Sequence, residues 1–387
     1  MAVIESIASN GIFVLSLAVV AGMAFGRLRY RGIAFGVAGP LFAGLILGHV
    51  GLSVPEPYFG LTLALFVASV GLIAAEDISG VIKTYGPFFI VLAAVMTAVG
   101  LALTYVSATV LFADAETALI MGSFTGALTS SPGLASAIEA LPAAAREPYQ
   151  IGHSIGYVVG VVLIVVFNQL YPQLAGLDMD AEKRTYEADV GGNADERADV
   201  SRVTFSLVGF GLVLAIGVVI GSIPIPMGPL GAPTLGTTGG VIIAALALGY
   251  RGTIGPITMR MDRDVLSELR TLTLGLFLAV VGVDAGAGFV TTVSDYGVQI
   301  VAAAAVNSLA AIVVGLVITR GLWNQDWITA AGGICGGHTD TKGLAAAIDA
   351  TDADEVGAAY GNAYPFALLF MVFYAKVLAL IVPVAVG

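Results

Sequence analysis

The chain is almost without cysteine and histidine, and this excludes several kinds of site. Its single cysteine, Cys335, cannot form an intrachain disulfide or a cysteine-based metal cage. Three histidines leave little material for a zinc site, so we expect neither a metal nor any other cofactor. The phosphate-binding pattern G-x-x-x-x-G-K-[ST] is also absent, which excludes a pump driven by nucleotide hydrolysis within this chain.

Charge is scarce as well. Only 11% of the residues are charged, whereas 58% are hydrophobic, and the mean hydropathy is +0.95. No soluble domain needs so much apolar surface, so the composition predicts an integral membrane protein. The first apolar run, residues 12–26, lacks a basic segment before it and is followed by Arg27. We therefore interpret it as a retained span and not as a cleaved signal peptide.

The few charges present are mostly acidic. The net charge is −11, it lies mostly in loops, and the chain has only four lysines. Acidic, lysine-poor loops are typical of a high-salt cytoplasm and argue against nucleic acid or anionic lipid as a partner. We expect a multi-pass protein of the inner or plasma membrane, from a halophilic prokaryote.

One polar segment occurs twice at a constant spacing of 210 residues. Residues 125–140 read TGALTSSPGLASAIEA, and residues 335–350 read CGGHTDTKGLAAAIDA. Thr129 thus matches Thr339. A polar, glycine-interrupted segment at matching positions in two halves indicates the binding site of a secondary transporter.

Apolar runs near the roughly 20 residues needed to cross a bilayer recur around both polar segments. In the first half we expect a polar segment at 118–142 and spans near 10–26, 33–50, 59–75, 86–112 and 150–171. In the second half we expect a polar segment at 328–350 and spans near 205–223, 233–249, 268–289, 294–319 and 358–385.

Basic residues predict how the halves are oriented, because short cytoplasmic loops collect lysine and arginine. Three arginines lie at 27–31 after the first span, whereas the counterpart loop 224–232 is uncharged. The bias reverses after the second span, since 51–58 has no basic residue and its counterpart 251–263 has three arginines. This reversal predicts inverted repeats, which require an odd number of crossings in each half.

The number of crossings is odd if each polar segment is a re-entrant hairpin. Non-helical backbone at membrane depth is tolerated where protein or a wet cavity surrounds it. We therefore predict an all-α polytopic membrane protein with two inverted repeats, 1–171 and 205–387, each of five transmembrane helices and one re-entrant hairpin. Both termini then lie outside. Residues 172–204 form an acidic cytoplasmic linker, solvated, with a short helix at most.

Residues of both hairpins also carry a family resemblance. They are Gly122, Gly126, Thr129-Ser130-Ser131-Pro132-Gly133-Leu134, Gly336 and Thr339-Asp340-Thr341-Lys342-Gly343-Leu344. At these positions, with support from Ala363-Tyr364-Pro365, the sequence resembles the aspartate:alanine exchanger family over essentially all of its membrane portion. The resemblance implies an antiporter of small carboxylates such as amino acids, with an elevator-like movement, within a homodimer.

The sequence departs from the family pattern in two places. Family members commonly carry TrkA-C-type regulatory domains between the halves, whereas here only residues 172–204 are present. Lys342 stands where the family pattern, and Pro132 in the first hairpin, has proline. The first departure concerns regulation, and the second concerns the substrate.

The hairpin tips are the predicted substrate site. Backbone amides at a helix N-terminus attract anions, and nearby hydroxyls complete the coordination. We predict that a small anionic substrate is bound from both sides, by Thr129, Ser130, Ser131, Gly133, Thr339, Asp340, Thr341, Lys342 and Gly343. The structural alternative is close helix packing by small residues.

Ionisable residues at membrane depth are candidates for coupling. Lys342 either neutralises a substrate carboxylate or pairs with Asp340, and a permanent ion pair is the structural alternative. Asp284, His338 and Asp340 are candidates for binding Na⁺ or H⁺. For Asp284 the alternative is an interfacial carboxylate, and for His338 it is a structural histidine.

The remaining polar residues in the spans are expected to support the helices. His153, Asn307 and Asn362 are predicted to form interhelical hydrogen bonds. Residues 152–156 match the G-x-S-x-G pattern of hydrolases, but they open an apolar span and lack the strand–turn–helix context. We therefore expect a secondary transporter and not an enzyme.

Two alternatives to the exchanger remain open. One is a cation:proton antiporter that uses Asp284, Asp340 and Lys342 as titrating groups. The other is a channel-like or sensory membrane protein without a coupled cycle, which the two matched hairpins disfavour.

Overall fold

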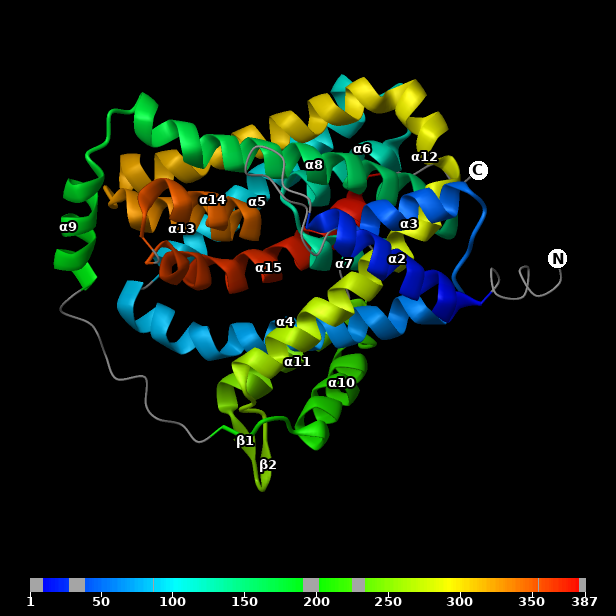
Figure 1. The fold of residues 1–387 in the computed structure, drawn as a ribbon, viewed down its shortest axis with the longest axis horizontal. Helices are drawn as coiled ribbons and strands as arrows, with labels where there is room; N and C mark the ends of the chain where they lie inside the picture. Colours follow the sequence, from blue (N-terminus) through cyan, green and yellow to red (C-terminus); the bar gives the residue numbers. More distant parts are fainter. Residues whose placement is uncertain are drawn as a thin grey trace.

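Figure 1 shows the computed structural model of the chain, in which helices make up most of the described residues. The structure describes residues 10–27, 39–85, 87–190, 202–224, 234–353 and 355–382. Arg29 and Arg31, linker residues 191–201 and both ends of the chain lie outside these ranges. The predicted helical class is confirmed, with a small antiparallel β-hairpin, β1 (Thr253–Ile254) and β2 (Ile257–Thr258), that the sequence did not indicate.

Both halves contain the same order of helices, except that the single helix α12 of the second half takes the place of α4 and α5 of the first. The first has α2 (Gly11–Gly26), α3 (Gly39–His49), α4 (Pro57–Tyr85), α5 (Phe88–Val106), the π-helical turn η2 (Ser107–Leu111), α6 (Thr117–Ala127), α7 (Ser131–Ala140) and α8 (Ala143–Leu174). The second has α10 (Leu207–Gly221), α11 (Gly236–Arg251), α12 (Arg263–Leu316), the π-helical turn η4 (Val317–Leu322), α13 (Trp327–Gly337), α14 (Thr341–Thr351) and α15 (Val356–Ile381).

Several of these helices are long and apolar enough to cross a membrane. Among the described residues there are four, at Phe88–Leu111, Ala143–Leu174, Arg263–Leu322 and Val356–Ile381. Shorter apolar helices accompany them, including α2, α3 and α10. These helices and their composition make the chain a membrane protein.

Each polar segment folds as a helical hairpin, which we call the first hairpin (α6 and α7) and the second hairpin (α13 and α14). Their first helices cover Thr117–Ala127 and Trp327–Gly337, so the spacing of 210 residues is kept at both ends. The π-helical turns begin at Ser107 and Val317, again 210 residues apart. The duplication read from the sequence is therefore also a duplication of local structure.

The predicted break between the spans 268–289 and 294–319 is wrong, because residues of both spans lie in the continuous helix α12. A straight helix of 54 residues would be about 80 Å long, more than twice the roughly 30 Å of a hydrocarbon core. Figure 1 shows α12, in yellow, bending at one side of the molecule and running back, so it has two arms. In the first half Pro87 precedes α5 and separates the equivalent helices, whereas residues 290–293 (VTTV) contain no proline.

The two halves are interleaved. Helix α4 of the first half packs on α11 of the second, where Gly71 faces Ala245. Helix α12 of the second half packs on α3 of the first, where a Cβ on Gly282 would collide with the carbonyl oxygen of Leu41. Small residues thus bring helices of opposite halves into backbone contact.

The linker helix α9 (Met179–Val190) lies against the second hairpin. The linker thus contains the short helix that was expected, but this helix is not solvated on all sides, because Tyr186 is only 8% exposed and Glu182 forms an ion pair with Arg320 of η4. No local sequence pattern indicates this contact, since the paired residues are far apart in the chain.

Candidate functional site

The two hairpin tips touch each other through a reciprocal pair of hydrogen bonds. The hydroxyl of Thr339 donates to the carbonyl of Leu128 at 2.6 Å, and the hydroxyl of Thr129 donates to the carbonyl of His338 at 3.3 Å. The two threonines are 210 residues apart, so matching residues of the two halves make matching contacts. The structure thus brings together the two segments that the sequence singled out.

Both threonines have an unusual backbone conformation. Their φ angles are +53° at Thr129 and +54° at Thr339, in the left-handed region that β-branched residues rarely adopt. Such a conformation costs about 1–3 kcal/mol per residue and persists only where the surroundings impose it. The reciprocal hydrogen bonds provide that constraint, and strain of this kind is concentrated at functional sites.

The helix that follows each tip has a side-chain cap. Ser130 accepts a hydrogen bond from the amide of Gly133 at 3.2 Å. One carboxylate oxygen of Asp340, Oδ1, accepts from the amides of Lys342 and Gly343 at 2.7 and 2.9 Å. At the second tip, the amides predicted to hold an anion are therefore already bound to the cap, so an anion must bind elsewhere or displace Asp340.

The side-chain ammonium group of Lys342 contacts the first half of the protein and not the carboxylate of Asp340. Its ammonium group donates to the hydroxyl of Tyr157 on α8 and lies 5.0 Å from the centre of that ring. The structure does not show one of the arrangements considered for Lys342, a permanent ion pair with Asp340. The ammonium group remains a positive charge next to the tips, held by a neutral partner.

Both buried histidines make one hydrogen bond and leave one ring nitrogen without a protein partner. His338 Nε2 lies 2.9 Å from the hydroxyl of Ser308 on α12, and His153 Nδ1 lies 3.0 Å from the hydroxyl of Thr125 on α6. Each side chain is 0% exposed. Asn307, also buried, donates to the hydroxyl of Thr104 on α5 at 2.8 Å and so joins two helices as predicted.

Several buried polar atoms around the tips have no protein partner. They include Asp340 Oδ2, His338 Nδ1, His153 Nε2, Asn307 Oδ1, Asn168 Oδ1 and Tyr360 Oη. A buried polar group left unpaired costs about 1–3 kcal/mol, so such groups normally bind water or a ligand. Their concentration here indicates a site built to hold a polar molecule.

Some predicted residues lie apart from this group. Asp284 is exposed on α12, and the charged residues around it are Glu56, Arg146 and Glu147. Thr341 is exposed, and Asn362 is half-buried on α15. Within the described part of the chain, no group of three His, Cys, Asp or Glu side chains is close enough together to hold a metal ion.

The remaining predicted tip residues and some unpredicted ones complete the site. Ser131, like Thr129 and Ser130, is buried at the first tip. The sequence reasoning missed Tyr157, Tyr360 and Asn168, whose amide nitrogen lies 3.3 Å from Cys335 Sγ. Asn168 had a detectable signal, because an asparagine within an apolar span is unusual. The two tyrosines had none.

Comparison with known proteins supports the same interpretation. A family model for the membrane region of predicted permeases, of the aspartate:alanine exchanger type, matches residues 14–173 and 209–380. The chain belongs to the aspartate:alanine exchanger family. The residues left between the two matched regions, 174–208, include most of the linker, 172–204.

Relatives of this family member are named transporters. An uncharacterized transporter of Bacteroides fragilis is 23% identical over 534 aligned positions, which cover 96% of this chain and 98% of the relative. An uncharacterized transporter of Corynebacterium glutamicum is 31% identical over 198 positions, 50% of this chain and 35% of the relative. The first alignment is longer than this chain of 387 residues, so that relative contains residues without a counterpart here. The protein is a membrane transporter and not an enzyme.

Proposed function

We propose that the protein is a secondary antiporter that exchanges small carboxylates, such as aspartate and alanine, by alternating access. The observation that carries this proposal is the reciprocal contact of Thr129 and Thr339 between two hairpins of matching structure. Two equivalent tips that meet in a buried polar site can separate toward opposite sides of the membrane in turn. A carrier needs two such gates, whereas a channel or a sensor does not.

The proposed architecture places the hairpins within the membrane. The halves, 1–171 and 205–387, are inverted repeats of five crossings and one re-entrant hairpin, with both termini outside and the linker in the cytoplasm. The reversed charge bias and the matched spacing of the hairpins support this arrangement. Movement of the hairpins is elevator-like, and the protein works as a homodimer, as the family resemblance implies.

The substrate's negative charge is proposed to bind next to Lys342. The side chain of Lys342 is half-buried, and its ammonium group donates to the hydroxyl of Tyr157 and to no carboxylate. A substrate carboxylate would supply the missing countercharge, and Asp340 Oδ2 and the free ring nitrogens of His153 and His338 would accept or donate the remaining hydrogen bonds.

The exchange assay uses purified protein in liposomes. We expect uptake of labelled aspartate that requires alanine inside and continues when the pH gradient is collapsed. Tyr157→Phe removes the hydroxyl that accepts the hydrogen bond from Lys342, and Lys342→Ala removes the charge. Both should reduce uptake, whereas Tyr105→Phe, the same change on an exposed tyrosine, should not. Uptake that ignores internal alanine would contradict exchange.

The second candidate is cation:proton antiport, and one observation favours it. Asp340 Oδ2 is buried without a protein partner, which suits a bound proton or Na⁺. Asp284 is not near Asp340, so the version with three titrating groups is weaker than the sequence suggested. Proton release from the liposomes on adding Na⁺ or K⁺, with no aspartate uptake, would favour this candidate.

A further inference from the structure

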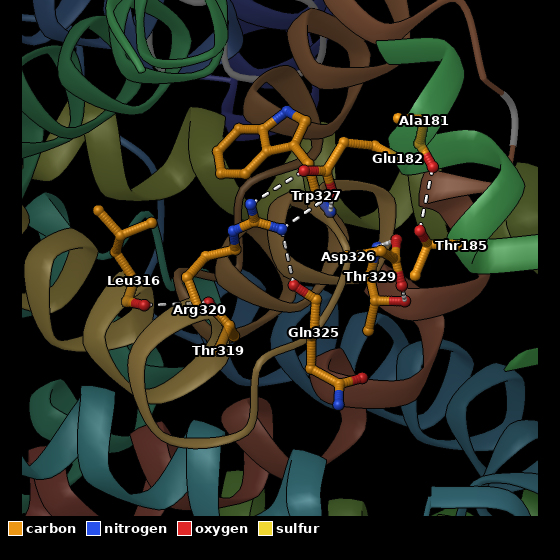
Figure 2. A network of polar contacts seen from close by, with 10 residues as sticks. All are labelled: Ala181, Glu182, Thr185, Leu316, Thr319, Arg320, Gln325, Asp326, Trp327 and Thr329. Atoms are coloured by element: carbon orange, nitrogen blue, oxygen red, sulfur yellow. Dashed lines mark hydrogen bonds and ion pairs between the residues drawn. The ribbon is translucent and has the colours of Figure 1, made fainter. Parts of the chain in front are cut away.

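The linker helix α9 is joined to the base of the second hairpin by a largely buried ion pair (Figure 2). The carboxylate of Glu182 receives two hydrogen bonds from the guanidinium of Arg320, each 2.9 Å long. The side chains are only 15% and 27% exposed. Arg320 lies in the π-helical turn η4, directly before the hairpin. A bidentate pair of this kind is stronger and more directional than an ordinary surface ion pair.

The same carboxylate also holds the first residue of the hairpin. Glu182 accepts a hydrogen bond from the amide of Trp327, where α13 begins. Arg320 in addition donates to the carbonyl of Gln325 at 2.8 Å. A negative charge at a helix N-terminus pairs with its free amides and with the helix dipole, so Glu182 stabilises the start of α13.

The next residue of α9 reaches the other end of the same hairpin. The ammonium group of Lys183 donates to the carbonyl of Asp352 at 2.7 Å. Asp352 directly follows α14 and has a φ of +48°, so the positive charge lies where that helix ends. Tyr186, one turn after Glu182, is buried here, and this burial raises the pKa of its hydroxyl. We call the interactions of Glu182, Lys183 and Tyr186 with this region the α9 contacts.

The first hairpin is held differently. Its last residues contact Arg146 of α8, whose Nε donates to the carbonyl of Leu141 at 3.3 Å. Arg146 in turn pairs with Glu56 at 3.5 Å, and Glu56 is largely exposed. These partners belong to the first half and not to the linker. The two hairpins are thus alike at their tips and unlike at their bases.

We propose that the α9 contacts regulate the opening of the second hairpin. While they are made, both ends of the hairpin are fixed and its tip stays against the first tip. Their release lets the second hairpin open more often than the first, so a change in the position of the linker alters access to the site. This inference rests on the proposed function only in what hairpin opening does for transport, because the α9 contacts hold the second hairpin whatever the protein transports.

Cys335 provides a reporter that needs no engineering. It is the only cysteine, it lies in α13, and it is 0% exposed, so a thiol reagent reaches it only when the second hairpin opens. The test uses the full chain in lipid nanodiscs. We expect Glu182→Gln to increase the rate of Cys335 labelling about tenfold, as the charge-assisted bonds are lost. Thr185→Ala, which changes an exposed residue of the same helix, should leave the rate unchanged.

Hydrogen exchange of the two hairpins provides the second measurement. In Glu182→Gln, exchange should accelerate in residues 327–351 and remain as in the wild type in residues 117–140. Equal acceleration in both hairpins would mean general destabilisation and would overturn the proposal, as would an unchanged labelling rate. If Glu182→Gln does not fold, Lys183→Met tests the other end of the hairpin with the same two measurements. Neither measurement uses a substrate, so failure of the exchange assay and failure of this inference are distinguishable.

Discussion

The two tip threonines should differ in how strongly they hold the hairpins together. Thr339 donates to the carbonyl of Leu128 at 2.6 Å, whereas Thr129 donates to the carbonyl of His338 at 3.3 Å, which is long for a hydroxyl donor. Valine keeps the β-branched shape and removes only the donor, so the backbone strain stays the same. Thr339→Val leaves the buried carbonyl of Leu128 unpaired and should cost about 1–3 kcal/mol. Thr129→Val should cost about 0.5 kcal/mol.

Labelling of Cys335 measures this difference. A cost of about 1.4 kcal/mol to the closed state changes its population relative to the open state tenfold, so Thr339→Val should accelerate labelling about tenfold or more. Thr129→Val should accelerate it only two- to threefold. Gel filtration of each variant confirms that it is folded. The reasoning is refuted if Thr129→Val accelerates labelling as much as Thr339→Val, or if neither variant changes it.

Four further substitutions have predictable outcomes. Gly122→Ala places a Cβ against a backbone carbonyl of α8 and should lower the free energy of unfolding by about 1–3 kcal/mol. Gly357 has open space around it, so Gly357→Ala should raise the free energy of unfolding by about 0.5 kcal/mol. Thermal unfolding in detergent measures both changes. Tyr157→Phe should raise the KM for aspartate at least threefold, and equal kinetics with Tyr105→Phe would contradict a role for that hydroxyl. Asn307→Leu loses a bond between α12 and α5 and should cost about 0.6 kcal/mol in the same unfolding assay, so a cost above 2 kcal/mol would indicate a larger role.

The duplication could be predicted because it consists of short sequence patterns that occur in both halves. The spacing between Thr129 and Thr339 fixed the correspondence of the hairpins, and their glycines and caps act within a few residues. The N-cap role of Asp340 was also readable, since aspartate is a preferred cap and a helical pattern follows it. We instead predicted that its carboxylate binds substrate, binds a coupling ion or pairs with Lys342, whereas the structure shows one of its oxygens used by the cap.

The continuous course of α12 was missed for a physical reason. We predicted separate spans on the two sides of residues 290–293, but no proline or cap forces the backbone out of the helix there. The corresponding break before α5 does contain Pro87. The duplication therefore predicts where corresponding helices lie in the sequence, but not whether each break between helices occurs in both halves.

Contacts between distant residues outside the duplicated hairpins could not be predicted. Glu182 and Arg320 are 138 residues apart, and no local pattern links them. Tyr157 became part of the site only because the ammonium group of Lys342 reaches it across the halves. Asp284 was predicted as a coupling residue because it is an acid in an apolar span, and the structure places Glu56, Arg146 and Glu147 around it and not the hairpin tips.

The measurement that tests the account most directly is a reversible cross-link between the tips. Thr129→Cys and Thr339→Cys, combined with Cys335→Ser, allow a short reducible reagent to join the two hairpins of protein in liposomes. The account predicts that cross-linking stops aspartate:alanine exchange and that reduction restores it, while either single cysteine has no such effect. Exchange that continues at the full rate across joined tips would contradict the claim that they separate in every cycle.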